Sequence, residues 1–288
     1  MTDIDTSKII DGRAVALKVE AEAAAAVLKL KEKGISPKLV TVLVGEDPAS
    51  QMYVRMKHKA CERVGILAEN CIKPADITEE ELFAVIDDLN KDKTVSSILV
   101  QLPLPRHINE KKIMDALSPS KDPDGFHPVH MGNLMINEEG LVPCTPKGMI
   151  RLMEEYNVGI KGKNAVVVGR SNIVGKPMAA MLLNRSATVS VCHSSTKDLK
   201  LYTKEADILV AGTGVKHLIK EDMVKEGAVV LDAGIVTDST GTYGDVDFEN
   251  VIKKASLITP VPGGVGPMTI AILMTHVVKC AEIIANEK

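Results

Sequence analysis

The first candidate for chemistry is a lysine on the apolar side of a predicted helix. The segment SQMYVRMKHKACERVGI, residues 50–66, has the periodicity of an amphipathic helix when successive residues are placed about 100° apart. Lys57 falls inside the apolar arc, one turn after Tyr53. Such a lysine either extends its ammonium group to water or lies in a partly dry cleft, where desolvation lowers the pKa of an ammonium group and suits it to acid–base catalysis. The pattern leaves both alternatives open, and Tyr53 either orients a flat substrate or is a core aromatic residue.

Two more polar residues in the N-terminal half suggest a binding site. Gln101 ends a predicted buried strand in ILVQLPLP, and ligands of open α/β sheets bind beyond the carboxyl ends of strands. Asp122 and Asp124 stand in the predicted turn KDPDGFHP. A carboxylate can accept two parallel hydrogen bonds from the edge of a 2-aminopyrimidinone ring, such as that of a pterin. The alternative for Asp124 is a turn-forming role before Gly125.

The C-terminal half contains a glycine turn typical of nucleotide binding. In VVVGRSNIVGKP, Gly169 and Gly175 lie between a buried strand and a helix start, where backbone N–H groups and the helix dipole suit a pyrophosphate. Ser171 departs from the G-x-G-x-x-G pattern, so a plain strand-to-helix turn is the alternative. The next strand ends in HSST and supplies no carboxylate for ribose hydroxyls, whereas Arg170 could pair with a 2′-phosphate. This favours NADP over NAD, although HSST could instead cap the next helix.

The elements that must position these residues alternate between strands and helices, which predicts parallel βαβ units. Ser50 is the expected N-cap of the first helix described above, and Thr78 with Glu81 forms an expected capping box. The Pro- and Gly-rich stretch 118–146 is predicted to be a loop that joins two domains and lines a site. Strands are predicted at 38–45, 95–105, from 163, 187–192, 207–214 and 228–235, and a strand-like turn region near 70–74. Helices are predicted at 11–33, 50–66, 78–92, 109–117, 146–157, 197–206 and 270–288.

Composition narrows the class of protein. The chain has 288 residues, 25% charged residues and a net charge of −3, so we expect a globular protein whose main partner is neither nucleic acid nor a membrane. The N-terminus has no apolar signal segment, and no apolar run is expected to reach transmembrane length. The five cysteines form no C-x-x-C pair, which indicates reduced thiols in a cytoplasmic protein. Spacing of His, Cys, Asp and Glu suggests no metal site.

The ordered set of motifs resembles one enzyme family over essentially the whole chain. The chain is similar to the bifunctional methylenetetrahydrofolate dehydrogenase/methenyltetrahydrofolate cyclohydrolases, and we expect it to lack the additional ligase region of their trifunctional relatives. The resemblance implies an α/β fold with two domains: a folate-binding catalytic domain (1–147 plus 268–288), a Rossmann-like NADP-binding domain (148–267), and a cleft between them. It rests on YVRMK, QLPLP, KDPDGFH, PCTPKG, GRSNIVGKP, ADILVAGTG, DVDF and TPVPGGVGPMT.

The resemblance also assigns roles in one folate cleft. Lys57 would assist proton transfer during hydrolysis, with Gln101 hydrogen-bonded to it. Tyr53 would stack on the folate, Asp124 would anchor the pterin edge, and Ser50 would lie beside them. A further cleft wall would be formed by Pro262, Gly263 and Gly264. NADP would be bound by Gly169, Arg170, Ser171, Ile173, Ser194 and Ile235.

The implied reactions are oxidation of 5,10-methylenetetrahydrofolate by NADP⁺ and hydrolysis of the methenyl product to 10-formyltetrahydrofolate. A homodimer is expected from the resemblance alone. Three alternatives remain at this point: a monofunctional dehydrogenase that uses NAD or NADP, a shikimate- or malate-type dehydrogenase, and a nucleotide-sensing or scaffold protein without turnover. The combination of Tyr53, Lys57, Gln101 and Asp124 argues for folate chemistry.

Overall fold

The chain forms two compact units in the computed structural model, which describes residues 5–138 and 140–286. The first unit contains the chain up to Ala16 together with Pro143–Thr269, and the second contains Leu17–Val142 together with the chain from Ile270 onward. Two helices, α1 (Gly12–Glu32) and α10 (Val265–Asn286), contribute residues to both units. The sequence-based prediction places the N-terminal residues in the folate-binding domain. In the structure, the described N-terminal residues up to Ala16 instead belong to the unit that contains the glycine turn at Gly169.

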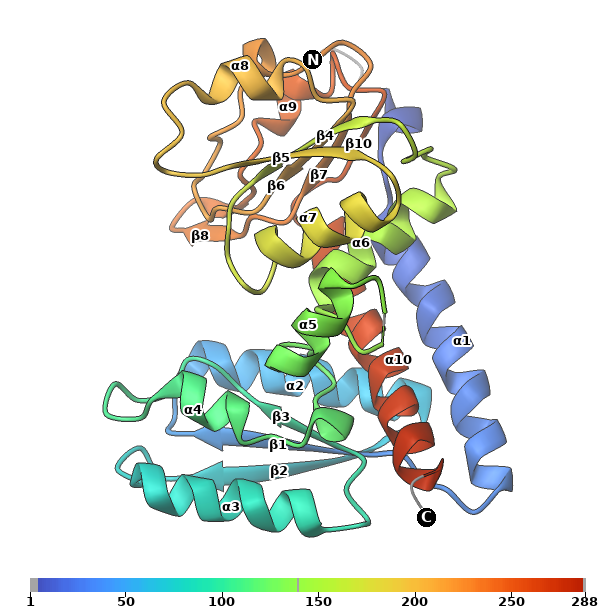
Figure 1. Cartoon of the computed structure of the whole chain (residues 1–288), viewed down its shortest axis with the longest axis vertical. Helices are drawn as coiled ribbons and strands as arrows, with labels where there is room; N and C mark the ends of the chain where they lie inside the picture. Colours follow the sequence, from blue (N-terminus) through green and yellow to red (C-terminus); the bar gives the residue numbers. More distant parts are fainter. Residues whose placement is uncertain (1–4, 139, 287–288) are drawn as a thin grey trace. The chain divides into compact units, whose positions relative to one another are not determined.

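The second unit is built on a three-stranded parallel sheet with the order β2–β1–β3 (Figure 1). Its strands are β1 (Lys38–Val44), β2 (Leu67–Lys73) and β3 (Ser97–Val100). Every residue of β3 is buried, and so is β1 beyond Lys38, as expected for apolar runs covered on both faces. Between the strands lie α2 (Pro48–Val64) and α3 (Glu79–Lys91), and β3 is followed by α4 (Glu110–Asp115) and a 3₁₀ turn, η2 (Pro119–Lys121).

Helix ends in this unit follow local side-chain chemistry. The predicted capping box is confirmed, because the Thr78 side chain and Glu81 exchange hydrogen bonds at the start of α3. The predicted N-cap of α2 is wrong: Asp47 caps the helix by accepting from the backbone N–H of Ser50 at 2.7 Å. Ser50 therefore lies inside the first turn of α2 and is not its N-cap.

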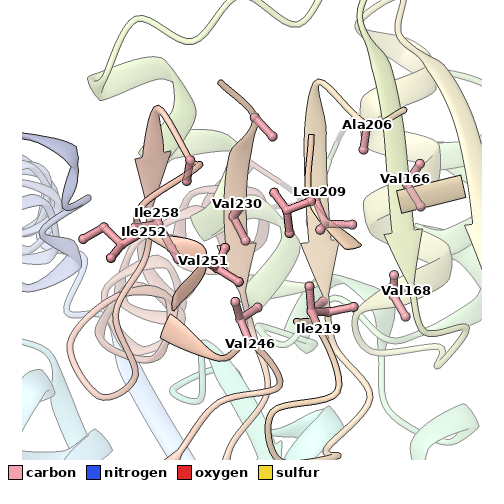
Figure 2. Packing of buried hydrophobic residues seen from close by; sticks show 14 of the residues in the cluster. Val166, Val168, Ala206, Leu209, Ile219, Val230, Val246, Val251, Ile252 and Ile258 are labelled. Atoms are coloured by element: carbon pink, nitrogen blue, oxygen red, sulfur yellow. The ribbon is translucent and has the colours of Figure 1, made fainter. Parts of the chain in front are cut away.

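The first unit carries a five-stranded parallel sheet with the order β10–β7–β6–β4–β5. Figure 2 shows one buried face of this sheet, where Val166, Leu209 and Val230 pack with Val251. On the chain, α7 follows β4 and contacts both β4 and β5. The elements are α6 (Cys144–Glu155), β4 (Asn164–Val168), α7 (Gly175–Asn184), β5 (Thr188–Cys192), α8 (Leu199–Thr203), β6 (Ile208–Ala211), β7 (Val229–Asp232), α9 (Phe248–Val251) and β10 (Leu257–Ile258).

Several elements depart from the sequence-based prediction. The stretch 118–146 is not a continuous loop, because it contains η2, helix α5 (Pro128–Met135) and the start of α6. Pro128 in the first turn and the His127 side chain, which accepts from the backbone N–H of Val129, provide the local start signal for α5. The unpredicted elements are short: 3₁₀ turns η1 (Thr6–Lys8) and η3 (Glu221–Met223), the hairpin β8 (Val236–Asp238) and β9 (Gly241–Tyr243), α9 and β10.

Helix α10 is longer than predicted and begins at Val265, within the motif TPVPGGVGPMT. The predicted end of this helix at residue 288 lies outside the described residues. Among the described residues α10 is the one helix long and apolar enough to cross a membrane by length and composition, so the expectation that no run reaches that length is wrong. More than half of its most apolar window is buried, which is typical of a core helix.

Candidate functional site

The second unit brings Lys57 and Gln101 together. Lys57 on α2 is half-buried, and its Nζ donates to Oε1 of Gln101 at 3.1 Å. Gln101 follows β3 directly and is only 9% exposed. Its Nε2 donates to the carbonyl oxygen of Leu102 at 2.7 Å, which orients the amide so that its oxygen faces the lysine. Of the two alternatives for Lys57, a side chain extended fully into water is therefore not what the structure contains.

Asp124 stands near this pair in a turn that is held by a second carboxylate. The buried side chain of Asp122 accepts from the backbone N–H groups of Asp124 and Gly125, each at 3.1 Å, and of His127 at 2.8 Å. Gly125 has φ +74°, and a Cβ there would lie 2.3 Å from the backbone of Val142. Asp122 and Gly125 thus shape the turn, which leaves the side chain of Asp124 free of the turn-forming role considered above.

The electrostatic surroundings of Asp124 are those of a functional carboxyl group. Desolvation by burial raises the pKa of Asp124 to about 6, while the positive charge of Lys57 lowers it and the charge of Asp122 raises it. A carboxyl group whose pKa is raised by burial, with a lysine side chain nearby, is typical of catalytic and binding sites. Lys57, Gln101 and Asp124 therefore form one polar cluster, which we call the Lys57 cluster.

The two other predicted site residues on α2, Ser50 and Tyr53, differ in solvent exposure. Ser50 is 4% exposed, whereas Tyr53 is 40% exposed. Tyr53 is accompanied on the surface by Met52 and Met56, so this end of the apolar arc is not packed in the core of its unit. An exposed aromatic side chain one turn from Lys57 remains available for stacking on a flat ligand.

In the first unit, two segments of backbone approach closely at the glycine turn after β4. Gly169 has φ +124°, and a Cβ there would lie 2.4 Å from the carbonyl oxygen of Gly212 in the loop after β6. A Cβ on Gly175 would lie 2.2 Å from the carbonyl oxygen of Gly169. The Ser171 hydroxyl accepts from the backbone N–H groups of Val174 and Gly175 at 3.1 and 3.4 Å. Packing thus explains both glycines, and Ser171 already satisfies two N–H groups at the start of α7.

The end of β5 offers hydroxyl and basic groups. His193 and Thr196 close the HSST turn, because the backbone N–H of His193 donates to the Thr196 hydroxyl at 2.9 Å. Asp198, not HSST, caps α8. Arg170, Ser194 and Lys197 are exposed. A guanidinium, an ammonium and a hydroxyl group are therefore available near the ends of β4 and β5, and HSST contains no acidic residue.

The other predicted residues also belong to the first unit. Ile173 and Ile235 are 48% and 52% exposed and follow β4 and β7. The loop before α10 contains Pro262, Gly263 and Gly264. This loop packs against the start of α1, because a Cβ on Gly12 would lie 1.7 Å from the Gly264 carbonyl oxygen. The grouping of this loop with the Lys57 cluster in one cleft stays a prediction.

Sequence inspection did not assign a role to two buried carboxyl groups, Asp232 and Asp245, although the motifs DAGI and DVDF contain them. Each accepts several backbone N–H groups next to the strand ends of the first unit. The signal that was available for Asp232 is an aspartate at the end of an apolar strand. In the part of the chain that the structure describes, no group of three or more His, Cys, Asp or Glu side chains is arranged to hold a metal ion.

Comparison with protein families assigns both halves of the chain to one family. Residues 10–124 match the tetrahydrofolate dehydrogenase/cyclohydrolase catalytic domain, and residues 143–285 match the NAD(P)-binding domain of the same family. The bifunctional protein FolD of Methanosarcina mazei is 66% identical over 277 residues, which cover 96% of each chain. The first match contains the Lys57 cluster, and the second contains the glycine turn.

Solved structures agree with this assignment. The bifunctional FolD methylenetetrahydrofolate dehydrogenase/cyclohydrolase of Campylobacter jejuni has a TM-score of 0.94 at 51% identity, covering 96% of this chain and 98% of that one. The methylenetetrahydrofolate dehydrogenase-cyclohydrolase of Trypanosoma brucei, solved with NADP cofactor and an inhibitor, has a TM-score of 0.91 at 38% identity, covering 96% and 97%. Both likenesses extend over the two units.

Proposed function

This chain belongs to the tetrahydrofolate dehydrogenase/cyclohydrolase family, and we propose that it carries out both reactions. It oxidises 5,10-methylenetetrahydrofolate to the methenyl form with NADP⁺, and it hydrolyses the methenyl form to 10-formyltetrahydrofolate. The observation that carries this proposal is the hydrogen bond of 3.1 Å between Lys57 and Gln101 beside Asp124. Hydride transfer alone has no use for such a proton-carrying cluster, whereas hydrolysis requires one.

In the hydrolysis, the residues of the cluster move and hold protons. Water adds to the cationic methenyl carbon, and the amine of Lys57 accepts the proton that this water loses. Ring opening then breaks the bond between that carbon and N5, the added hydroxyl becomes the formyl oxygen, and Lys57 returns a proton to N5. One proton is released overall. Gln101 suits this role because its neutral amide orients the amine without fixing it as an ion pair.

Binding of the folate is proposed to rest on Asp124 and Tyr53. The carboxylate of Asp124 accepts two parallel hydrogen bonds from the pterin edge. The exposed ring of Tyr53, on the same helix as Lys57, stacks on the flat substrate. Ser50 and the loop of Pro262, Gly263 and Gly264 are further proposed contacts, supported by the resemblance.

Oxidation depends on alignment rather than on acid–base chemistry. NADP⁺ supplies the hydride acceptor, and the chain must hold it and the folate in register. Gly169 allows the turn after β4 to approach the loop after β6 closely, and ligands of open α/β sheets bind beyond these strand ends. NADP rather than NAD is proposed because HSST offers no carboxylate while Arg170 is exposed; Ser171, Ile173, Ser194 and Ile235 complete the proposed contacts.

The decisive experiment follows both steps in one spectrophotometric assay with methylenetetrahydrofolate and NADP or NAD. For Lys57→Met we expect cyclohydrolase turnover to fall about 10²-fold or more, as for loss of a general base, and dehydrogenase turnover to be largely retained. Lys59→Met is the matched control, because Lys59 is an exposed lysine of the same helix. Cyclohydrolase turnover near the wild-type rate in Lys57→Met would show that the assignment is wrong.

The same assay separates the bifunctional enzyme from a monofunctional dehydrogenase, which would form the methenyl product without hydrolysing it. The resemblance further carries the expectation of a cytoplasmic homodimer. Light scattering coupled to size-exclusion chromatography measures the mass in solution, and a mass of one 30.9 kDa chain would contradict the dimer.

A further inference from the structure

The strand order of the first unit identifies which loops border a dinucleotide. The chain passes from β4 to β5 on one side and then returns to β6 on the other side of β4. The crevice beyond the carboxyl ends of β4 and β6 is therefore the topological switch point, where open α/β sheets bind their ligands. It is bordered by the glycine turn at Gly169 and by the loop 212–215, which we call the β6 loop. Figure 1 shows β6 between β4 and β7.

The β6 loop is tied down by one buried carboxylate. Asp245 is completely buried. Its Oδ2 accepts from the backbone N–H and the hydroxyl of Thr213, the latter at 2.8 Å, and from the N–H of Gly214 at 3.3 Å. Its Oδ1 accepts from the N–H of Val215 at 2.9 Å. Three successive backbone N–H groups of the β6 loop thus point at one side chain.

A second buried carboxylate, that of Asp232, accepts hydrogen bonds from the loop after β7 and from Asp245 itself. Asp232, at the end of β7, accepts from the N–H groups of Gly234 and Asp245 at 2.9 and 3.1 Å and of Val246 at 2.8 Å. A Cβ on Gly234 would lie 2.1 Å from Oδ1 of Asp245, so the glycine makes room for the buried carboxylate. Gly234 directly precedes Ile235, one of the proposed cofactor contacts.

We propose that Asp245 is a positioning residue for the cofactor: it holds the β6 loop in the conformation that receives the nicotinamide dinucleotide at the switch point. The inference rests on the proposed function for the identity of the ligand. Asp245 itself is buried and touches no ligand; it acts through Thr213, Gly214 and Val215. The exposed face of the loop includes the half-exposed side chain of Val215, which follows β6 as Ile173 follows β4 and Ile235 follows β7.

The bifunctional enzyme supplies its own control, because hydrolysis of the methenyl substrate consumes no NADP. In Asp245→Asn an amide NH₂ group must face at least one loop N–H, since both carboxylate oxygens accept from the loop. We expect KM and Kd for NADP to rise about tenfold or more, as for loss of a buried charge-assisted acceptor. The kcat/KM of the cyclohydrolase step should stay within about twofold of wild type, because the Lys57 cluster is untouched.

The matched control is Asp247→Asn, two residues along the same motif. Asp247 accepts from Asn250 and lies 3.8 Å from Lys220, and no hydrogen bond joins it to the β6 loop within the described residues. It should leave NADP binding unchanged. Isothermal titration calorimetry with NADP suits this chain, which has no tryptophan. Thr213→Val removes the hydroxyl that donates to Asp245 and accepts from the N–H of Val215 at 3.3 Å, but it keeps the backbone donors to Asp245. A smaller rise of about threefold in Kd for NADP is therefore expected.

Unchanged NADP binding in Asp245→Asn, or a proportional loss of both activities, would overturn the inference. If Asp245→Asn does not fold, Thr213→Val decides: wild-type Kd for NADP in that variant would also overturn it. Failure of the proposed function is seen separately, in the wild-type protein, as the absence of NADP-dependent oxidation. That result would contradict the proposed ligand, and with it the role proposed for Asp245.

Discussion

Replacing Gln101 by glutamate tests whether the Lys57 cluster needs a neutral partner for the lysine. The acceptor Oε1 lies 3.1 Å from Nζ of Lys57, and a carboxylate at that position would stabilise the protonated amine. At an effective dielectric constant of about 20, the Coulomb term at this distance is about 5 kcal/mol. Desolvation of the buried carboxylate offsets much of this, but about a quarter of it suffices for a tenfold loss of neutral amine at a given pH.

We therefore expect Gln101→Glu to lower cyclohydrolase turnover at pH 7 by about tenfold or more, with partial recovery as pH rises and the amine loses its proton. Dehydrogenase turnover should change little. Gln101→Met is the matched control, because it removes the same hydrogen bonds without adding a charge. The coupled spectrophotometric assay measures both variants across pH. Equal losses in Glu and Met variants, with no recovery at high pH, would refute the charge argument and leave only a positioning role.

Three further predictions follow from the geometry. Because burial raises the pKa of Asp124 to about 6, its carboxyl group is neutral below that pH and cannot accept both pterin hydrogen bonds; kcat/KM for the folate should rise with pH through about 6, and a pH profile of Asp124→Asn that keeps this limb would contradict the assignment. Arg170→Ala should raise KM for NADP about tenfold through loss of a charged contact, and an equal rise for NAD would exclude the 2′-phosphate as its partner. Asp122→Ala leaves three backbone N–H groups without their acceptor and should lower the free energy of unfolding by about 3–5 kcal/mol in urea titrations; an unchanged midpoint would show that water replaces the carboxylate.

Much of the fold was predictable because its signals are local. The β-branched apolar run before Gly45 predicts a buried strand, and Thr78 with Glu81 marks a helix start, since both depend on residues that are neighbours in the chain. The family resemblance agrees with the two matched domains for the same reason, because each of its motifs is a short stretch of consecutive residues. Helix α5 was missed because its Pro, His and Gly content resembles a loop, and its start depends on a His127 side chain that accepts a hydrogen bond.

The sequence by itself determined that Lys57 is misplaced for a solvated lysine, that a glycine turn follows β4, and that HSST holds no carboxylate. Only the tertiary structure decided what those residues meet. The structure places Lys57 within hydrogen-bond distance of Gln101, which is 44 positions away in sequence. It shows that Asp122, and not Asp124, accepts the hydrogen bonds that hold the turn. It also shows that Asp245 accepts hydrogen bonds from a loop 30 to 32 positions earlier. The physical reason is that a hydrogen bond depends on distance and direction in space, and parallel sheets bring strand ends together that are far apart in the chain.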